Sequence, residues 1–537
     1  MGDGIVGVER EAEWAVAEFG AAVLGDARRT ERLVRLAGVL GARPRAALAE
    51  ACDDPAMLKA AYRFLENGAI EPQAVLASHA AATVERARGA AVVLAVQDTT
   101  HIEWDAPAAD AQQEGLWVHS TVALTPDGLA LGVLAQEQWT RAVGEQGVAA
   151  RRRDRAIAEK ESRKWLGGLD ATNAAARDCP TTHWIAAGDR ECDIYDVFRR
   201  EREANVDLVV RAAQDRALAD DPDAGETRLL RARVAARPVG GTYALEVPRQ
   251  GARPARTAQI AVRWARVEMR PPRSRAAEKL PAVTLWAVWA HEDTPPPGVE
   301  ALDWLLLTTL PVGDADTARV VLGYYAHRWG IEIFHKVLKS GCAIERRRLA
   351  ALDHMQRALA LYSVIAWRVL TLTLLARAQP DLPCTTLLDD DEWQALYCAI
   401  HQTTVPPAAP PSLADATRWI AQLGGFLRRA ARDLPGVTVL WRGFLRLADL
   451  TLMYRVFHPP RHPPNVGKGK PVAEDAHIWK QVAQSGGVAE VIGVGVRHDE
   501  HGDTLGKIAS LNAPRHRARH SRIEERPRPV VLQRVDV

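Results

Sequence analysis

Apolar residues recur along this chain in two rhythms, and the change from one to the other comes near residue 90. Before that point apolar positions repeat every three or four residues, which predicts amphipathic helices. Segment 30–41 is one such helix, with Asp26 as its N-cap, and segment 55–67 is another, preceded by Asp54-Pro55. We therefore expect residues 1–90 to be mainly helical.

After residue 90 the apolar positions form short continuous runs rich in β-branched residues, which predicts buried strands. The run 90–104 breaks at Asp98-Thr99-Thr100, so we expect a strand with an acid at its end. The strand in 182–188 ends in the same way, at Asp189. The same signal predicts further strands in 118–139 (two, joined at the turn Pro126-Asp127-Gly128), in 208–213 and in 303–312.

The remainder of the chain alternates between these patterns. Residues 212–300 are rich in Arg, Pro and Gly with short strand-like runs, and we interpret them as a β-rich insertion. Residues 353–378 predict a long apolar helix, and further helices are expected up to residue 454. The segment 150–164 is a charged helix or loop with excess positive charge, and the tail 455–537 has few apolar runs.

A helix predicted over residues 325–339 carries the most distinctive polar stripe. At about 100° per residue, Tyr325, Arg328, Glu332 and Lys339 lie within an arc of roughly 60°. The apolar residues of the segment lie on another face, where they can pack on a core. A carboxylate between an aromatic hydroxyl and two cations suits a site that holds a metal ion beside a phosphodiester. The alternative is an exposed face with an Arg–Glu pair one turn apart, worth a few tenths of a kcal/mol.

Composition narrows the class of protein. The 537 residues are enough for several domains, 47% of them are hydrophobic, and the net charge is only +2, so any case for nucleic-acid binding depends on local clusters. Six scattered cysteines without a C-x-x-C pair argue against a zinc site or a disulfide framework and suit a reducing cytoplasm. We expect no signal peptide, because the N-terminus lacks a basic region followed by an apolar core. We expect no membrane association, because no apolar run approaches the ~20 residues of a membrane helix.

Three acids stand out by their context: Asp98 and Asp189 at strand ends, and Glu332 on the helix. Carboxylates that converge from a sheet edge and a facing helix can hold two hard cations, and Mg²⁺ suits such a site. Each acid also has a structural alternative. Asp98 could cap a turn, Asp189 could pair with Arg190, and Glu332 could pair with Arg328.

In three segments the sequence resembles the DDE transposases of the IS-four group, the family that includes the Tn-five transposase. These segments are AVQDTT around Asp98, GDRECDIY around Asp189, and the spaced set Y-x-x-R-x-x-x-E-x-x-x-x-x-x-K that starts at Tyr325. Shorter similarities, such as LGDARRTERLV, WVHSTVAL and EKESRKWL, extend the resemblance over roughly residues 14–454. Beyond residue 455 we find no resemblance to the family.

The resemblance implies an α/β fold with an RNase-H-like core, in which a five-stranded mixed sheet is flanked by helices. It implies a catalytic triad of Asp98, Asp189 and Glu332 that binds two Mg²⁺ ions, with Mn²⁺ able to substitute. The implied chemistry is nicking at a transposon end, hairpin formation, hairpin opening and strand transfer into target DNA. The expected domains are a helical end-recognition domain at 1–75, a catalytic domain at 76–375 with its insertion at about 212–300, a helical dimerisation region at 376–454, and a basic tail of unknown role at 455–537.

The resemblance also implies which residues contact DNA. Trp304 stands where the family places a tryptophan that stacks on an extruded base, although a strand-core role is the alternative from the sequence; Trp329 is a weaker second candidate. The phosphate-contacting residues would be Tyr325, Arg328, Lys336, Lys339 and Arg211. Arg28, Arg29 and Arg63 resemble end-recognition contacts, and the alternative for them is a solvated helical face.

The expected partners are the terminal inverted repeats of a transposon, target DNA and a second copy of this chain, and the expected location is the bacterial cytoplasm, at the nucleoid. Two other functions are consistent with such a fold. A DNA-binding regulator derived from a transposase would not need the three acids. An RNase-H-like nuclease would not need the end-recognition domain, Trp304 or the dimerisation helices.

Overall fold

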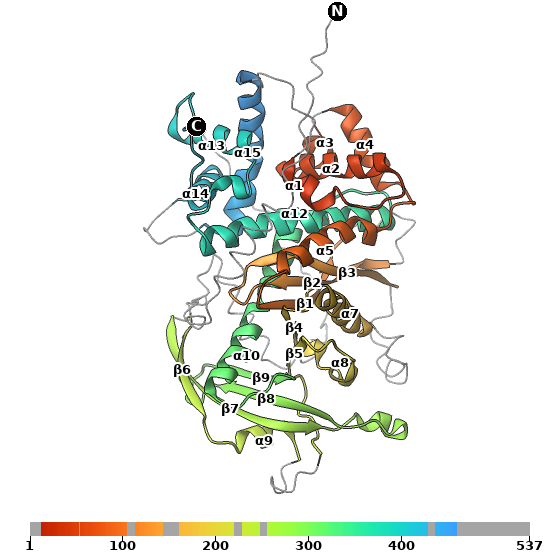
Figure 1. Ribbon diagram of the computed structural model, residues 1–537, viewed down its shortest axis with the longest axis vertical. Helices are drawn as coiled ribbons and strands as arrows, with labels where there is room; N and C mark the ends of the chain where they lie inside the picture. The colour runs from red at the N-terminus through yellow and green to blue at the C-terminus, as the bar shows by residue number, and fades with distance from the viewer. Residues whose placement is uncertain are drawn as a thin grey trace, which may run out of the picture.

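The computed structural model describes residues 12–52, 54–104, 113–142, 161–219, 228–247, 255–427 and 435–458. Helices occupy one end of the molecule, a sheet crosses its middle, and long strands form the other end (Figure 1). Two sequence expectations lie outside the described residues: the basic segment up to residue 160, and the tail from residue 459.

A single sheet of nine strands, in the order β3-β2-β1-β4-β5-β9-β8-β7-β6, runs through the described part of the chain. In its first half β1 pairs antiparallel with β2 and parallel with β4, and β4 pairs parallel with β5. These five strands form the mixed sheet expected of an RNase-H-like core. Their bounds are Val92–Ile102 for β1, Gln113–Leu124 for β2, Ala130–Ala142 for β3, His183–Gly188 for β4 and Val206–Arg211 for β5.

The predicted β-rich insertion is present, and it continues the same sheet. Strand β9 is antiparallel to β5 on one side and to β8 on the other, so main-chain hydrogen bonds run from the core into the insertion without interruption. The remaining insertion strands follow outward and lie at the foot of the view in Figure 1. The bounds are Gly241–Val247 for β6, Arg256–Met269 for β7, Val283–His291 for β8, Asp303–Thr308 for β9 and Leu230–Ala235 for the short helix α9.

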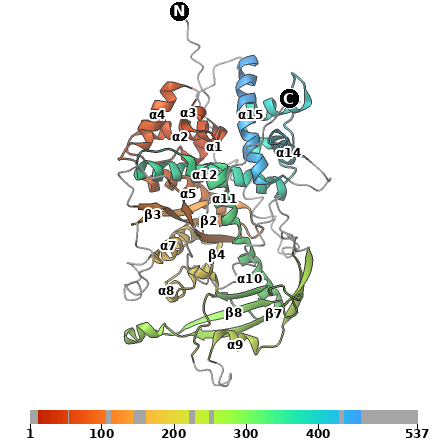
Figure 2. The ribbon, with the colours of Figure 1, turned by 180° about the vertical axis from the view of Figure 1, so that it is seen from behind.

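Helices cover both faces of the core sheet. Helices α5 (Pro72–Ala87), α11 (Gly330–Lys336) and α12 (Leu352–Ala378) pack on one face, as Figure 2 shows from behind. Helix α7 (Arg163–Asp178) packs on the other face, beside α8 (Tyr195–Arg199). The β-branched and small residues of β1 and β4 are buried on both sides, which is why their sequences are continuous apolar runs.

Helix α12 is the central core helix. Within the described residues it alone is long and apolar enough to cross a membrane, but 94% of its most apolar window is buried inside the protein. Its polar side chains bond to the core: the Trp367 indole N–H and the Thr371 hydroxyl both donate to the Ala130 carbonyl at 3.0 Å. The apolar character of this helix is therefore explained by packing between the sheet and the terminal helices.

The N-terminal helices begin where the sequence predicts. The Asp26 carboxylate accepts from the Arg28 amide at the start of α2, and the Asp54 carboxylate caps α4. A buried ion cluster of Glu18, His79 and Arg86 joins α1 to α5 beside β3. The bounds are Glu13–Phe19 for α1, Ala27–Ala42 for α2, Leu48–Ala51 for α3 and Pro55–Leu65 for α4.

Three C-terminal helices pack beside α12, next to the N-terminal ones at the same end of the molecule in Figure 1, and α15 contacts α2. They are α13 (Asp390–His401), α14 (Leu413–Leu423) and α15 (Val437–Phe457). The last turns of α15 expose four large apolar side chains, from Leu452 at 48% to Phe457 at 71%, with Met453 and Val456 between them. A row of exposed apolar side chains at a helix end is typical of a surface that another protein covers.

The single helix predicted over 325–339 is wrong in its bounds and its continuity. Helix α10 begins ten residues earlier, at Ala315, and ends at His327, and α11 starts only at Gly330. The last part, Val337–Gly341, is a π-helical turn. The predicted apolar anchors on this segment are all buried: Ile331, Phe334 and Leu338. Periodicity detected the buried face, but it cannot detect a break in which the backbone torsions stay near α-helical values.

Candidate active site

Asp98 and Asp189 occupy equivalent places on two neighbouring parallel strands. The parallel ladder between β1 and β4 ends at Val96 opposite Ala187, and each acid follows two residues later. The expectation that Asp98 ends its strand is wrong, because β1 continues to Ile102 through its antiparallel pairing with β2. The pairing of β1 with β4 ends near Asp98, so from there β1 has no neighbouring strand on the β4 side within the described residues.

Asp189 directly follows the end of β4, as the sequence predicts. Its carboxylate accepts a hydrogen bond from the Glu191 amide at 2.8 Å and so caps the 3₁₀ turn Arg190–Cys192. The preceding residue must be glycine for this turn to fold back on the strand. A Cβ added at Gly188 would lie 2.4 Å from the Cys192 Cβ, which is too close for any side chain.

Arg328 connects the helix to the strand. Its Nη1 donates to the Asp98 Oδ2 at 3.2 Å, and its Nη2 donates to the Glu332 Oε1 at 2.6 Å. The Arg328 side chain is only 5% exposed, and its position lies in the short break between α10 and α11. The structure therefore brings Asp98 and Glu332 to the two sides of one guanidinium group.

The charges in this cluster perturb each other. Burial and then the neighbouring Asp98 charge raise the pKa of Asp189 to about 6, with the attraction of Arg328 opposing them. Burial works against the charge of Arg328, but Tyr325, Asp98 and Glu332 together raise the pKa of its guanidinium above its ordinary value. A bound cation would stabilise the charged form of Asp189 and so offset the repulsion from Asp98.

The donor set of this cluster fits a divalent metal ion. Asp98, Asp189 and Glu332 offer carboxylate oxygens, which are the ligands that Mg²⁺ and Mn²⁺ prefer. In the part of the chain that the structure describes, no group of three His, Cys, Asp or Glu residues is close enough to hold a metal ion. Arg328 lies between two of the acids in this arrangement and bonds to one oxygen of each, Asp98 Oδ2 and Glu332 Oε1.

Two buried histidines next to the cluster were not predicted from the sequence. His335 follows Glu332 by one turn, and burial lowers the pKa of its imidazole to about 4. His119 on β2 bonds to the Thr99 hydroxyl at 2.9 Å and the Gln97 side chain at 3.2 Å, and burial lowers its pKa well below the ordinary value. Both rings are neutral at pH 7, so they add polar groups without charge. The segments that hold them, WVHSTVAL and the helix motif, were already singled out by the resemblance.

A buried lysine reaches the cluster from α7. The Lys164 ammonium lies 3.5 Å from the Glu191 carboxylate, in the turn that Asp189 caps, and the residue is only 6% exposed. It lies over the rings of Trp139 and Trp165, at 5.4 and 5.7 Å from the ring centroids. Lys164 belongs to EKESRKWL, which carried part of the resemblance, but no role was predicted for it.

Trp304 and Tyr325 lie together beside the cluster. Their ring centroids are 5.3 Å apart with the planes at 75°, an edge-to-face contact. Trp304 is partly buried near the start of β9. This partial burial is compatible with both predictions for it, a base-stacking residue and a residue of the strand core. Arg211, at the end of β5, is 4% exposed and donates to the Asp303 carbonyl at 2.9 Å, which fixes the residue before Trp304.

The two lysines of the helix motif lie apart from the acids. Lys336 is exposed at the end of α11. Lys339 is in the π turn, where its ammonium pairs with the Glu345 carboxylate at 3.0 Å. The wider turn changes the angular spacing after Lys336, so the ideal helical arc does not describe Lys339.

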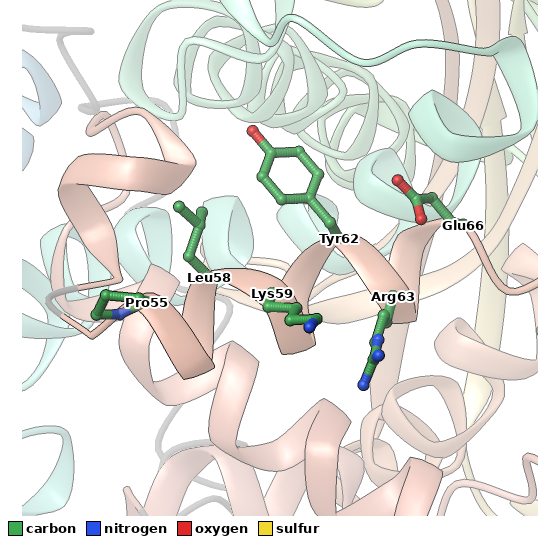
Figure 3. Close-up of a pocket in the computed structure, with 6 residues that line it drawn as sticks. All are labelled: Pro55, Leu58, Lys59, Tyr62, Arg63 and Glu66. Carbon is green, nitrogen blue, oxygen red and sulfur yellow. The ribbon is translucent and has the colours of Figure 1, made fainter.

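The predicted end-recognition arginines lie on the outer surface of the N-terminal helices. The Arg28 side chain is 84% exposed and pairs with Asp26, whereas Arg29 donates to the Leu24 carbonyl at 2.9 Å. Arg63 lines a shallow hollow of about 460 Å³ along α4 (Figure 3). The side chains around this hollow are Pro55, Leu58, Lys59, Tyr62, Arg63 and Glu66.

Three family models match parts of the chain in order along the sequence. The transposase DNA-binding model matches residues 11–70, the transposase DDE domain matches 170–368, and the transposase Tn5 dimerisation domain matches 364–455. The chain belongs to the Tn5-like DDE transposases. The resemblance to this family seen in the sequence is therefore confirmed, and the chain has the domain architecture of a DNA transposase.

The matched regions correspond to separate parts of this transposase. The DNA-binding match contains α1 to α4, and the dimerisation match runs from within α12 to the last turn of α15, ending at residue 455. The DDE match starts within α7, so it contains Asp189 and Glu332 and begins after Asp98. DDE domains use divalent metal ions, which agrees with the oxygen-rich donor set of the cluster.

Proposed function

We propose that this protein is a cut-and-paste DNA transposase in which Asp98, Asp189 and Glu332 form the catalytic site. The observation that carries the proposal is the placement of these acids in one neighbourhood with Arg328, at separations wider than those of an assembled metal site. Strand register sets Asp98 beside Asp189, and Arg328 connects Asp98 to Glu332 across the gap between sheet and helix. A regulator that only binds DNA has no need for such a costly concentration of charge.

Two Mg²⁺ ions held by the three carboxylates would activate the attacking oxygen and stabilise the leaving oxygen of a phosphodiester. The protein's own residues have other tasks. The sheet and α11 hold the carboxylates, and Gly188 gives Asp189 its tight turn. Arg328, which bonds to both acids, would also bind the phosphate beside them, because its guanidinium fork matches phosphate oxygens. One such site can nick an end, form a hairpin, open it and transfer the strand, since each step is the same displacement with a different attacking oxygen.

Trp304 and its neighbours suit the hairpin step. Forming a hairpin requires a base to leave the stack, which costs a few kcal/mol. An aromatic side chain that accepts the base returns about 1–3 kcal/mol. Trp304 is partly buried against Tyr325, and Arg211 fixes the strand just before it, so its ring is held in a defined place near Arg328. Tyr325, Lys336 and Lys339 would contact the adjacent phosphates.

End recognition is assigned to the surface of α2 and α4. The hollow along α4 combines Lys59, Arg63 and the Tyr62 ring on one exposed face (Figure 3). Cations bind phosphates, and a neighbouring aromatic ring can contact a sugar or base edge. Arg28 and Arg29, at the start of α2, are the other proposed end contacts.

Dimerisation is assigned to the C-terminal helices. The exposed apolar row of Leu452, Met453, Val456 and Phe457 begins inside the matched dimerisation region and continues just past its last residue, 455. A homodimer would bring two transposon ends together before cleavage. The cytoplasm, at the bacterial nucleoid, is the place where such a protein would meet its DNA.

The test uses the terminal inverted repeats that flank the coding sequence. Purified protein is incubated with one labelled repeat end and Mg²⁺. A hairpin followed by a blunt double-strand break supports the transposase. Specific binding without cleavage would instead indicate a regulator, and cleavage that ignores the repeat would indicate a nuclease.

A further inference from the structure

A short segment joins the π turn after α11 to helix α12, and we call residues 342–349 the strap. The Cys342 amide closes the π turn by donating to the Val337 carbonyl at 2.8 Å. Ala343 then adopts a left-handed conformation, with φ of 48°, which is costly for a residue with a side chain. The strap is therefore sharply bent and attached directly to the helix that carries Glu332.

Arg347 fixes the strap to the N-terminal domain. Its Nη2 donates to the Cys342 carbonyl and to the Pro44 carbonyl, each at 2.6 Å, and its Nη1 donates to the Ala46 carbonyl. The guanidinium lies 4.4 Å from the centroid of the Tyr362 ring, and the residue is 6% exposed. A buried, charged donor with three main-chain acceptors leaves little freedom on either side.

Two of the three carbonyls that Arg347 holds, those of Pro44 and Ala46, belong to the connection between α2 and α3. Helix α2 carries Arg28 and Arg29 at its start, and α3 leads into α4, which carries Arg63. Arg347 therefore contacts the part of the chain between the two helices assigned to end recognition.

The same strap reaches the strand that carries Asp98. The Glu345 carboxylate accepts from the Lys339 ammonium at 3.0 Å and from the Glu103 amide at 3.2 Å. Glu103 is the first residue after β1, five positions beyond Asp98. The strap thus connects the end-recognition helices, the π turn after Glu332 and the end of the Asp98 strand.

We propose that Arg347 is a positioning residue that couples DNA occupancy of the N-terminal helices to the placement of Glu332 relative to Asp98. Hydrogen bonds of this kind tolerate changes of only a few tenths of an ångström, so a shift of the α2–α3 connection moves Cys342 or breaks the bonds. A displacement of about 1 Å at a reacting centre costs roughly 100-fold in rate. This proposal rests on the transposase function proposed above.

Arg357 provides a matched control within the same chain. It too is buried and donates to main-chain carbonyls of the N-terminal region, to Leu65 and Ile70 at 2.7 Å each. Arg357 is on α12, however, and not on the strap. Its loss should weaken the attachment of the same domain without touching the link to Glu332.

The experiment compares wild type, Arg347→Met, Arg347→Lys and Arg357→Met as full-length proteins. The DNA is a duplex of the element's terminal inverted repeat. It is shortened so that the cleavage junction is missing but wild type still binds the duplex. Hydrogen exchange of residues 330–341 is followed with and without this duplex. We expect the duplex to change exchange there in wild type and Arg357→Met, and to leave it unchanged in Arg347→Met while the N-terminal helices remain protected.

Cleavage of the complete repeat end with Mg²⁺ gives the second measurement. Arg347→Met should cut about 10- to 100-fold more slowly with its Kd for the end within about 3-fold of wild type, and Arg347→Lys should lie between the two. If the duplex does not change hydrogen exchange of residues 330–341 in wild type, the proposed coupling is wrong, whether or not any variant folds. If Arg357→Met slows cleavage as much as Arg347→Met does, Arg347 only attaches the N-terminal domain and does not position Glu332. Failure of wild type to cut the complete end would overturn the transposase function, and the exchange response would still decide the coupling.

Discussion

The Glu18 cluster and the Asp98 cluster both bury carboxylate groups beside an arginine, but their charges are matched to different degrees. Glu18 accepts from Arg86 at 2.7 Å and from His79 at 2.5 Å, and these partners outweigh burial and lower its pKa to about 2. In the other cluster Asp98, Asp189 and Glu332 gather around Arg328, and the pKa of Asp189 rises to about 6.

This difference separates a structural cluster from a functional one. The remaining polar atoms of the two partners of Glu18 are also bonded: His79 Nε2 accepts from the Val133 amide at 3.0 Å, and Arg86 Nε donates to the Leu131 carbonyl at 2.6 Å. A fully bonded ion cluster joins elements and is destabilised by any loss. A cluster with excess negative charge costs stability until a cation binds, which is typical of a site that works on a ligand.

Neutralising the acids around Arg328 should produce the largest effect. Asp98→Asn, Asp189→Asn and Glu332→Gln should each slow end cleavage by roughly 10³-fold or more, because each removes a group needed for transition-state charge. Binding of the repeat end should persist. Metal-free Asp189→Asn should be no less stable than wild type, since burial and the Asp98 charge both disfavour the Asp189 carboxylate. Normal cleavage by any one variant would remove that residue from the proposed triad.

Substitutions in the Glu18 cluster should instead lower stability and leave cleavage unchanged. Arg86→Met leaves Glu18 buried without its main partner and should lower the free energy of unfolding by about 3–5 kcal/mol. Cleavage per folded molecule should stay near wild type. Urea denaturation measures the loss, with Arg88→Met as control, because the Arg88–Glu85 pair is half exposed and worth less than about 1 kcal/mol. A small loss in Arg86→Met would contradict the structural interpretation of the cluster.

A smaller change at the edge of the Asp98 cluster tests the stacking residue. Trp304→Ala should leave nicking intact and slow hairpin formation by about 5- to 150-fold, the equivalent of 1–3 kcal/mol of base stacking. Trp304→Phe should recover part of the rate. Gel analysis of nicked and hairpin products separates the two steps. Equal loss of both would indicate that Trp304 only packs against Tyr325.

The smallest effect concerns pH. Burial lowers the pKa of His79 from its ordinary value near 6.5, with Glu18 opposing and Arg86 adding to the effect. The unfolded chain therefore binds a proton near pH 6.5 that the folded protein does not, and stability should fall as pH drops below that value. Unfolding midpoints between pH 8 and pH 5.5 measure the slope, which His79→Gln should reduce. An unchanged slope would show that other histidines account for it.

The sequence predicted the core strands, the helix caps and the family, because these depend on local patterns. It could not place Asp98 within its strand, since the continuation to Ile102 depends on pairing with β2, a distant segment. It also could not show the break around Arg328, where a guanidinium reaches two acids from different elements. The contacts of Arg347 and the Glu18 cluster are likewise products of tertiary packing, and no spacing in the sequence indicates them.

The continuous sheet has a practical consequence for anyone who shortens this protein. Strand β9 bonds to β5 through one edge and to β8 through the other. Deleting the insertion up to residue 300 would leave β9 with a bare, apolar edge, and such edges recruit strands from other molecules. A compact version would therefore be expected to aggregate unless β8 were kept or the new edge carried charged residues.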